Sequence, residues 1–100
     1  MNNVMLTLVM PNDIAQHVED LLISHPDVVG GFTATAAEGH GASVQLVQPS
    51  ELVSGHAPRT TIQTVGTEAA MQIVVDLIRR HLPGANVFFW LTPVIEMGRL

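Results

Sequence analysis

The residues best suited to chemistry lie at the two ends of the stretch from Glu38 to Pro58, EGHGASVQLVQPSELVSGHAP. His40 and His56 stand near these ends, each beside glycine, and Glu38 adds a carboxylate. Neutral imidazole together with carboxylate suits a divalent transition ion such as zinc, copper or nickel. If the two strands that flank this stretch pair as a hairpin, its ends meet, and we therefore predict a metal site formed by Glu38, His40 and His56. The alternative is that both histidines are solvated loop residues, because two histidines this far apart in sequence lack a fixed ligand spacing.

Glycines and one arginine at the same two ends complete the predicted ligand-binding site. Gly39, Gly41 and Gly55 permit backbone conformations that other residues avoid, so the chain could approach a ligand closely there. Arg59 could hold an anion or the carboxylate of Glu38, or it could be an exposed arginine at the end of a strand. The segment between the two ends is mostly small or polar, and we expect it to be mobile until a partner or ligand binds.

Composition excludes several other functions. The net charge is −5, with four arginines and no lysine, which argues against nucleic acid as a partner. The chain has no cysteine and therefore neither a disulfide nor a thiolate metal site. Ser43, Ser50 and Ser54 have no neighbouring base at a recognisable spacing, so no catalytic residue is predicted. No apolar run approaches the roughly 20 residues that span a bilayer, and no basic leader is visible, so we expect a cytoplasmic protein without membrane insertion.

The helices and strands before and after the stretch from Glu38 to Pro58 must position its two ends. Hydrophobic periodicity and turn residues predict the elements in order. They are a strand over 4–10, a helix capped by Asp13 and ended by Pro26, a strand over 28–37, a strand over 59–65, a helix capped by Thr67 and ended by Pro83, and a strand over 87–92. The predicted apolar stripes of the helices are Ile14, Val18, Leu21 and Leu22 in the first, and Ala70, Ile73, Val74, Leu77 and Ile78 in the second.

This order predicts the fold class, an α+β ferredoxin-like βαββαβ sandwich in a single domain over 1–100. Such a fold has an antiparallel sheet with both helices on one face, and here a long loop joins its second and third strands. The first and third strands would be central. The last strand, VFFWLT, would then leave large apolar side chains uncovered, so we expect copies of the chain to stack their open sheet faces.

The segment after the last strand is too apolar for a free end. It could add a strand to a neighbouring copy or clasp it. Glu96 and Arg99 within it are expected to form an ion pair, within one subunit or between two.

Three pieces of the sequence carry a resemblance to a known family: GGFTATAAEGHG, VSG with the following HAPRTTIQ, and NVFFWLTPVIEMGRL. They look like a proteobacterial family of uncharacterised proteins in the nitrogen-regulatory PII-like superfamily, which also holds the CutA proteins. The genes of that family are often found beside heavy-metal efflux pumps. The resemblance covers nearly the whole chain, and W-x-x-P-V-x-E-x-G-R-L is its most specific motif. It implies a trimer whose loop projects near the clefts between subunits.

Departures from the PII pattern limit what the resemblance implies. PII proteins bind ATP or ADP with a glycine-rich, lysine-containing loop after the second helix, and here that position is HLPGANV. They also carry a tyrosine in the long loop as the target of uridylylation, and this chain has no tyrosine. We therefore expect neither ATP binding of that kind nor this modification.

The function expected from these features is that of a non-enzymatic, trimeric PII-like sensor or adaptor. Its 38–58 loop would bind a small ligand or metal ion and a partner protein, and the resemblance suggests a membrane efflux protein as that partner. One alternative is a CutA-like protein for divalent-metal binding and tolerance. Another is a small enzyme that uses a cleft between subunits.

Overall fold

Helices and strands follow one another along the chain in the predicted order. The computed structural model describes residues 2–41 and 57–100. The elements are β1 (Asn3–Pro11), α1 (Asn12–Ile23), β2 (Thr33–Gly39), β3 (Ala57–Thr67), α3 (Glu68–His81) and β4 (Phe88–Pro93). No helix in this described part of the chain is long and apolar enough to cross a membrane.

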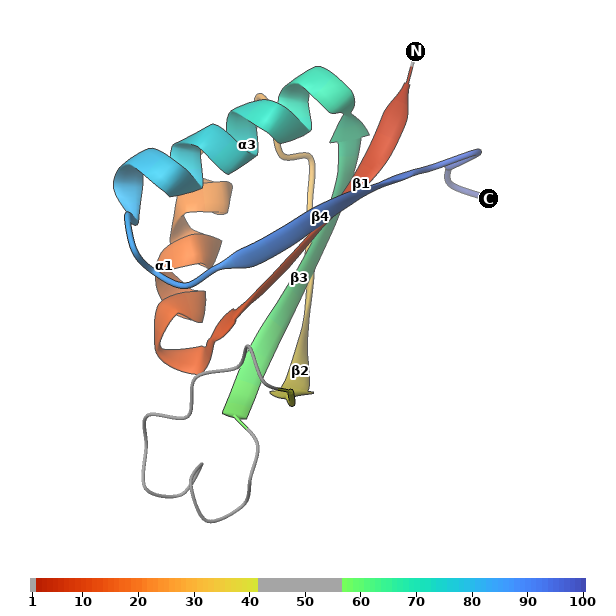
Figure 1. The fold of residues 1–100 in the computed structure, drawn as a ribbon. Helices are drawn as coiled ribbons and strands as arrows, with labels where there is room; N and C mark the ends of the chain where they lie inside the picture. The colour runs from red at the N-terminus through yellow and green to blue at the C-terminus, as the bar shows by residue number, and fades with distance from the viewer. Residues whose placement is uncertain (1, 42–56) are drawn as a thin grey trace.

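The four strands form one sheet in the order β2-β3-β1-β4, and every neighbouring pair is antiparallel. Strands β1 and β3 are therefore central and β2 and β4 are the edges, as predicted. Both helices lie on the same side of the sheet (Figure 1). This arrangement confirms the ferredoxin-like α+β fold.

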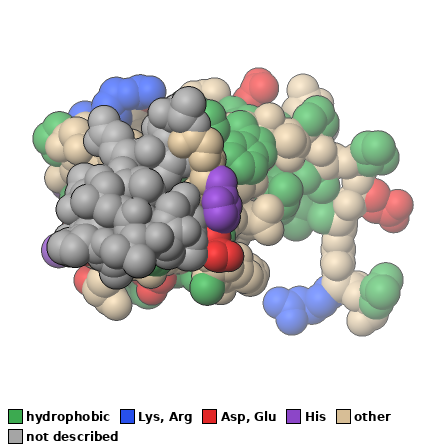
Figure 2. Space-filling model, turned by 60° about the horizontal axis from the view of Figure 1, so that its bottom comes forward, with side chains coloured by type: hydrophobic (Ala, Val, Ile, Leu, Met, Phe, Trp, Pro, Cys, Tyr) green, Lys and Arg blue, Asp and Glu red, His purple; other side chains and the backbone are tan. Residues whose placement is uncertain are grey.

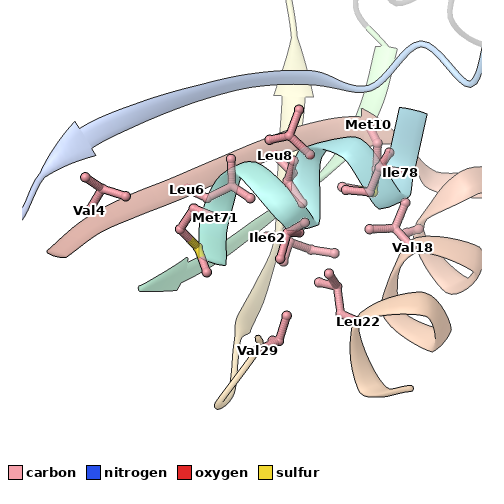
Figure 3. Close-up of a cluster of buried hydrophobic side chains, with 13 residues drawn as sticks. Val4, Leu6, Leu8, Met10, Val18, Leu22, Val29, Ile62, Met71 and Ile78 are labelled. Atoms are coloured by element: carbon pink, nitrogen blue, oxygen red, sulfur yellow. The ribbon is translucent and has the colours of Figure 1, made fainter. Parts of the chain in front are cut away.

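Alternation along β1 builds the core. Val4, Leu6, Leu8 and Met10 are buried and point toward the helices, as Figure 3 shows. The helices and β3 supply the facing side chains, which are Val18, Leu22, Ile62, Met71 and Val74. Full burial of one such side chain stabilises the fold by about 1.5–3 kcal/mol. The sheet and helices are therefore held together mainly by this one apolar layer.

The two helices begin differently, and one predicted cap is wrong. Thr67 caps α3 as predicted, because its side chain accepts a hydrogen bond of 3.1 Å from the backbone N–H of Ala70. At α1 the N-cap position belongs to Pro11, without a side-chain bond, and Asp13 lies inside the first turn. Strand β1 stays paired up to Pro11, opposite Arg59, and the helix follows without a linker. Asp13 therefore acts on the helix dipole rather than as a cap.

The apolar stripe of α3 is turned relative to the prediction. Ile73 is 47% exposed, whereas Met71 is fully buried. Gly66 explains part of this difference, since a Cβ added there would lie only 2.8 Å from the Met71 Cε. The methionine uses the space that the missing side chain leaves beside the end of β3.

Strand β2 begins later than predicted, at Thr33 instead of residue 28. The backbone N–H groups of Val28 and Val29 both donate to the carbonyl of His25, at 3.2 and 3.0 Å, and so wrap the chain around the end of α1. The Thr64 hydroxyl then donates to the Gly31 carbonyl at 2.7 Å. Strand β3 is longer than predicted and pairs with all of β1.

Candidate functional site

The β2–β3 hairpin brings the two ends of the long connection together. In its register Ala37 lies opposite Arg59, Glu38 opposite Pro58 and Gly39 opposite Ala57. The sequence prediction that the loop ends meet is therefore confirmed for these residues. We call residues 38–41 together with 57–59 the hairpin foot. Figure 2, which brings the lower end of Figure 1 forward, shows a histidine and an acidic side chain exposed on this face.

Within the hairpin foot, Glu38, His40 and Gly41 are exposed and Gly39 is half-buried. Gly41 has φ 116°, a conformation that residues with a side chain rarely adopt, so its glycine is required by the backbone path. Gly55 and His56 lie outside the described residues. Across 2–41 and 57–100 no three histidine, aspartate or glutamate side chains cluster closely enough to hold a metal ion. A metal site at Glu38, His40 and His56 thus stays a prediction.

Arg59 is buried, with 8% of its surface exposed, so the alternative of an exposed strand-end arginine is wrong. It projects from the central strand β3 on the face away from the helices, and its Nη1 donates to the Pro58 carbonyl at 3.0 Å. This bond fixes the guanidinium near the end of the hairpin. A planar guanidinium held in place is well suited to a carboxylate, a carbonate or a phosphate.

The sheet face away from the helices carries almost no charge. The pairing registers place alternate residues of each strand on it, and among the described residues Arg59 is its one charged side chain. The others in its middle are Met5, Thr7, Val9, Thr33, Thr35, Thr61, Gln63, Val65, Phe88, Trp90 and Thr92. Phe88 is 68% and Trp90 42% exposed, and their ring centroids lie 5.9 Å apart. We call this surface the open sheet face.

A cavity of about 310 Å³, not predicted from the sequence, lies where α3 ends and β4 begins. Its lining is mostly apolar and includes Ile78, Phe89 and the segment 82–87, with Arg79 as its charged member. Positive φ angles of 73° at Gly84 and 60° at Asn86 shape that segment. The sequence signal was the Pro-Gly-Ala-Asn run, which predicted the end of a helix and stands where PII proteins have their nucleotide-binding loop. The guanidinium of Arg79 already pairs with Asp76 at 2.9 Å on the exposed surface of α3.

The fold and the long β2–β3 connection define the class. The chain shares its fold with PII-like and CutA proteins of known structure. The PII-like protein CPII from Thiomonas intermedia K12, solved bound to ADP, AMP and bicarbonate, matches with a TM-score of 0.72 at 14% identity, covering 100% of this chain and 97% of that one. The periplasmic divalent cation tolerance protein CutA from Archaeoglobus fulgidus matches with a TM-score of 0.71 at 7% identity, covering 97% and 88%.

Within that class the chain belongs to the DUF3240 family, described as protein of unknown function, whose model matches residues 1–100. A crystal structure of a DUF3240 family protein from Shewanella baltica OS155 has a TM-score of 0.76 at 18% identity and covers 100% of this chain and 98% of its own. No curated protein sequence matches this chain. The predicted resemblance to the PII and CutA group is therefore confirmed.

Proposed function

We propose that this protein is a non-enzymatic PII-like sensor or adaptor that works as a homotrimer. Its ligand site is the hairpin foot, which contains Glu38, His40 and Arg59. The observation that carries this proposal is the β2–β3 register, which brings the two ends of the long connection together and sets Glu38 opposite Pro58, the residue before the buried Arg59. A ligand bound there would fix both ends of the connection at once. The state of the connection could then be recognised by a partner protein.

The chemistry of the foot favours a small anion, alone or together with a divalent metal ion. The Arg59 guanidinium suits an oxyanion, while the His40 imidazole and the Glu38 carboxylate suit a transition ion. The structural relative CPII was solved with bicarbonate, AMP and ADP, which makes these compounds the first to test. The absence of lysine from the segment after α3 argues against ATP binding of the PII kind.

Trimer formation is supported by the open sheet face. A surface that leaves Phe88 and Trp90 substantially exposed, with Arg59 as the one charged side chain among its described residues, is costly in water, and this cost is relieved when copies of the chain cover it. The resemblance to proteins encoded beside heavy-metal efflux pumps suggests a membrane efflux protein as partner. A cytoplasmic location would be consistent with that role.

Native mass measurement combined with calorimetry tests the proposal. We expect a trimer that binds at least one of bicarbonate, AMP, ADP, zinc, copper or nickel. His40→Ala should weaken that binding about tenfold, the loss of one good polar contact, while His17→Ala, an exposed histidine on α1, should leave it unchanged. A monomer that binds none of these compounds would overturn the proposal.

A second candidate is a CutA-like protein for divalent-metal binding. The exposed carboxylate and imidazole two residues apart, Glu38 and His40, favour it. It differs from the first in that a metal ion alone should bind, without an anion and without change in the affinity for a partner. Two results together would favour this candidate over the sensor. The native protein would bind no anion, and both His40→Ala and His56→Ala would lose zinc binding.

A further inference from the structure

The cavity between the end of α3 and the start of β4 lies on the side of the sheet that the helices cover. Leu8 lines it and points toward the helices, as Figure 3 shows. Phe89 is the partner of Leu8 in the β1–β4 register and therefore points to the same side. Val75 and Ile78 of α3 form the wall toward the core. The cavity thus lies beside β4, at the edge of the sheet opposite to β2 and the hairpin foot.

The segment between α3 and β4 forms the rim of this cavity. The Leu82 N–H donates to the Ile78 carbonyl at 2.9 Å, and the Ala85 N–H donates to the Leu82 carbonyl at 3.2 Å. Gly84 and Asn86 have φ angles of 73° and 60°, so the backbone turns sharply on both sides of Ala85. Figure 1 shows this segment as the blue connection that leaves the end of α3 and returns to the sheet as β4. The rim is therefore shaped by its own backbone turns.

The lining of the cavity favours an apolar ligand of small size. Its apolar members are Leu8, Val75, Ile78, Leu82, Val87 and Phe89. Water has few hydrogen-bond partners against such a lining, so an apolar molecule displaces it readily. The volume of about 310 Å³ equals the share of liquid volume of roughly ten water molecules. A ligand body of about that many non-hydrogen atoms fits.

Two polar side chains in the lining indicate the polar group that the ligand carries. Arg79 is the charged member, and the carboxamide of Asn86 can donate beside it. The Arg79 Nη1 donates to the Asp76 Oδ1 at 2.9 Å, but the two side chains are 65% and 60% exposed. An exposed ion pair of this kind is weak, and a guanidinium has five N–H donors. Arg79 can therefore bind a second carboxylate.

We propose that this cavity binds a small monocarboxylic acid with an apolar body, such as a medium-chain fatty acid. The apolar body fills the cavity and the carboxylate lies at its rim on Arg79. A nucleotide matches poorly, because residues 81–87, HLPGANV, contain no lysine or arginine to hold its phosphates. The cavity is a second ligand site, and the inference does not depend on the proposed function of the hairpin foot.

Nuclear magnetic resonance with octanoate, a probe of about ten non-hydrogen atoms, tests where the ligand binds. Octanoate should shift the methyl signals of Leu8 and Ile78, which line the cavity. The methyl signals of Val29, which lies on the far side of the core in Figure 3, should not move. If octanoate shifts no signal at millimolar concentration, or shifts Val29 as much as Ile78, the proposal is overturned.

Arginine variants test the role of the carboxylate. Arg79→Gln should weaken octanoate binding about tenfold, the loss of one charge-assisted contact, and leave the binding of the neutral octanamide unchanged. Arg80→Gln is the matched control, since Arg80 is the next residue of α3, is exposed and does not line the cavity. Both variants remove the same charge. Equal losses in the two would show general attraction to a cation and would overturn the assignment of Arg79.

A larger side chain in the rim tests the cavity without a change of charge. Ala85→Leu should abolish the binding of both octanoate and octanamide, while thermal unfolding shows a protein at least as stable as the native one. Ala69→Leu, at an exposed position of α3, should bind both probes as the native protein does. Unchanged octanoate binding by a folded Ala85→Leu variant would contradict the proposal.

Competition separates this site from the hairpin foot. His40→Ala should leave octanoate binding unchanged, and AMP or ADP should not displace octanoate. Displacement by either nucleotide would overturn the proposal, because the cavity would then be part of a nucleotide site. Octanoate binding in a protein that binds no bicarbonate, nucleotide or metal ion would support the cavity site while the proposed function fails.

Discussion

Two threonines of β3 hold neighbouring segments in place through single hydrogen bonds. Thr67 caps α3, and Thr64, which is only 3% exposed, donates to the carbonyl of Gly31 in the segment that leads into β2. Each bond joins residues that different elements contribute. Removal of one hydroxyl therefore tests one junction of the fold at a time.

Thr67→Ala should lower the free energy of unfolding by about 1 kcal/mol, because the Ala70 N–H loses its side-chain acceptor at the first turn of α3. Urea unfolding followed by circular dichroism measures the change. Thr67→Ser keeps the oxygen and should stay close to the native value. An alanine variant as stable as the serine variant would show that water satisfies this N–H equally well.

Thr64→Val should also cost about 1 kcal/mol, because valine has the same shape but cannot donate to the Gly31 carbonyl. The same urea measurement applies. Thr35→Val is the control, since Thr35 is exposed on β2 and its substitution should change stability by less than about 0.5 kcal/mol. Similar losses in both variants would contradict a specific role of the bond.

At the scale of the elements, the end of β3 packs closely against the start of α3 because the residue at the contact is a glycine. Gly66 borders Met71, whose side chain is fully buried. The core is close-packed, so an added methyl group must displace the methionine or shift the helix. The strand–helix junction therefore depends on glycine at this one position.

Gly66→Ala should destabilise the protein by about 1 kcal/mol, the lower end of the usual cost of overpacking, because the group that must move is the flexible end of Met71. Thermal unfolding gives the measurement. At Gly30 an added Cβ meets nothing within 4 Å, so Gly30→Ala is the matched control and should be neutral or slightly stabilising. A neutral Gly66→Ala would show that Met71 adjusts without cost.

The helices and strands were predictable from sequence where the hydrophobic periodicity agrees with the capping and turn residues. The Thr67 cap, the alternation of β1 and the strand order followed from such signals. The late start of β2 did not, because it depends on a local turn in which Val28 and Val29 donate to the His25 carbonyl and on a long-range bond from Thr64 to Gly31. The exposed Ile73 depended on the contact of Met71 with Gly66. At the candidate site, the meeting of the loop ends was predictable, whereas the burial of Arg59 and the cavity beside α3 depend on packing in three dimensions.

At the scale of the whole molecule, the two faces of the sheet have different chemistry. One face is covered by α1 and α3, and the other presents threonines, a glutamine and the rings of Phe88 and Trp90, with Arg59 as its one charged side chain among the residues that the structure describes. The other charged residues that the structure describes lie instead on the helices, in the segment between α1 and β2, at the loop ends and in the segment after β4. This distribution separates an assembly surface from surfaces that stay in water.

Phe88→Arg should therefore dissociate the proposed trimer while leaving each subunit folded, because it adds a cation to the open sheet face at a side chain that is already 68% exposed. Ile23→Arg is a matched control, since Ile23 is 66% exposed at the end of α1, on the opposite side of the sheet. Sedimentation should show a monomer for the first variant and a trimer for the second, with native-like circular dichroism in both. If Phe88→Arg stays trimeric, the copies do not assemble through the open sheet face. If Ile23→Arg alone dissociates, the helices form the interface, and the open sheet face is free for another partner.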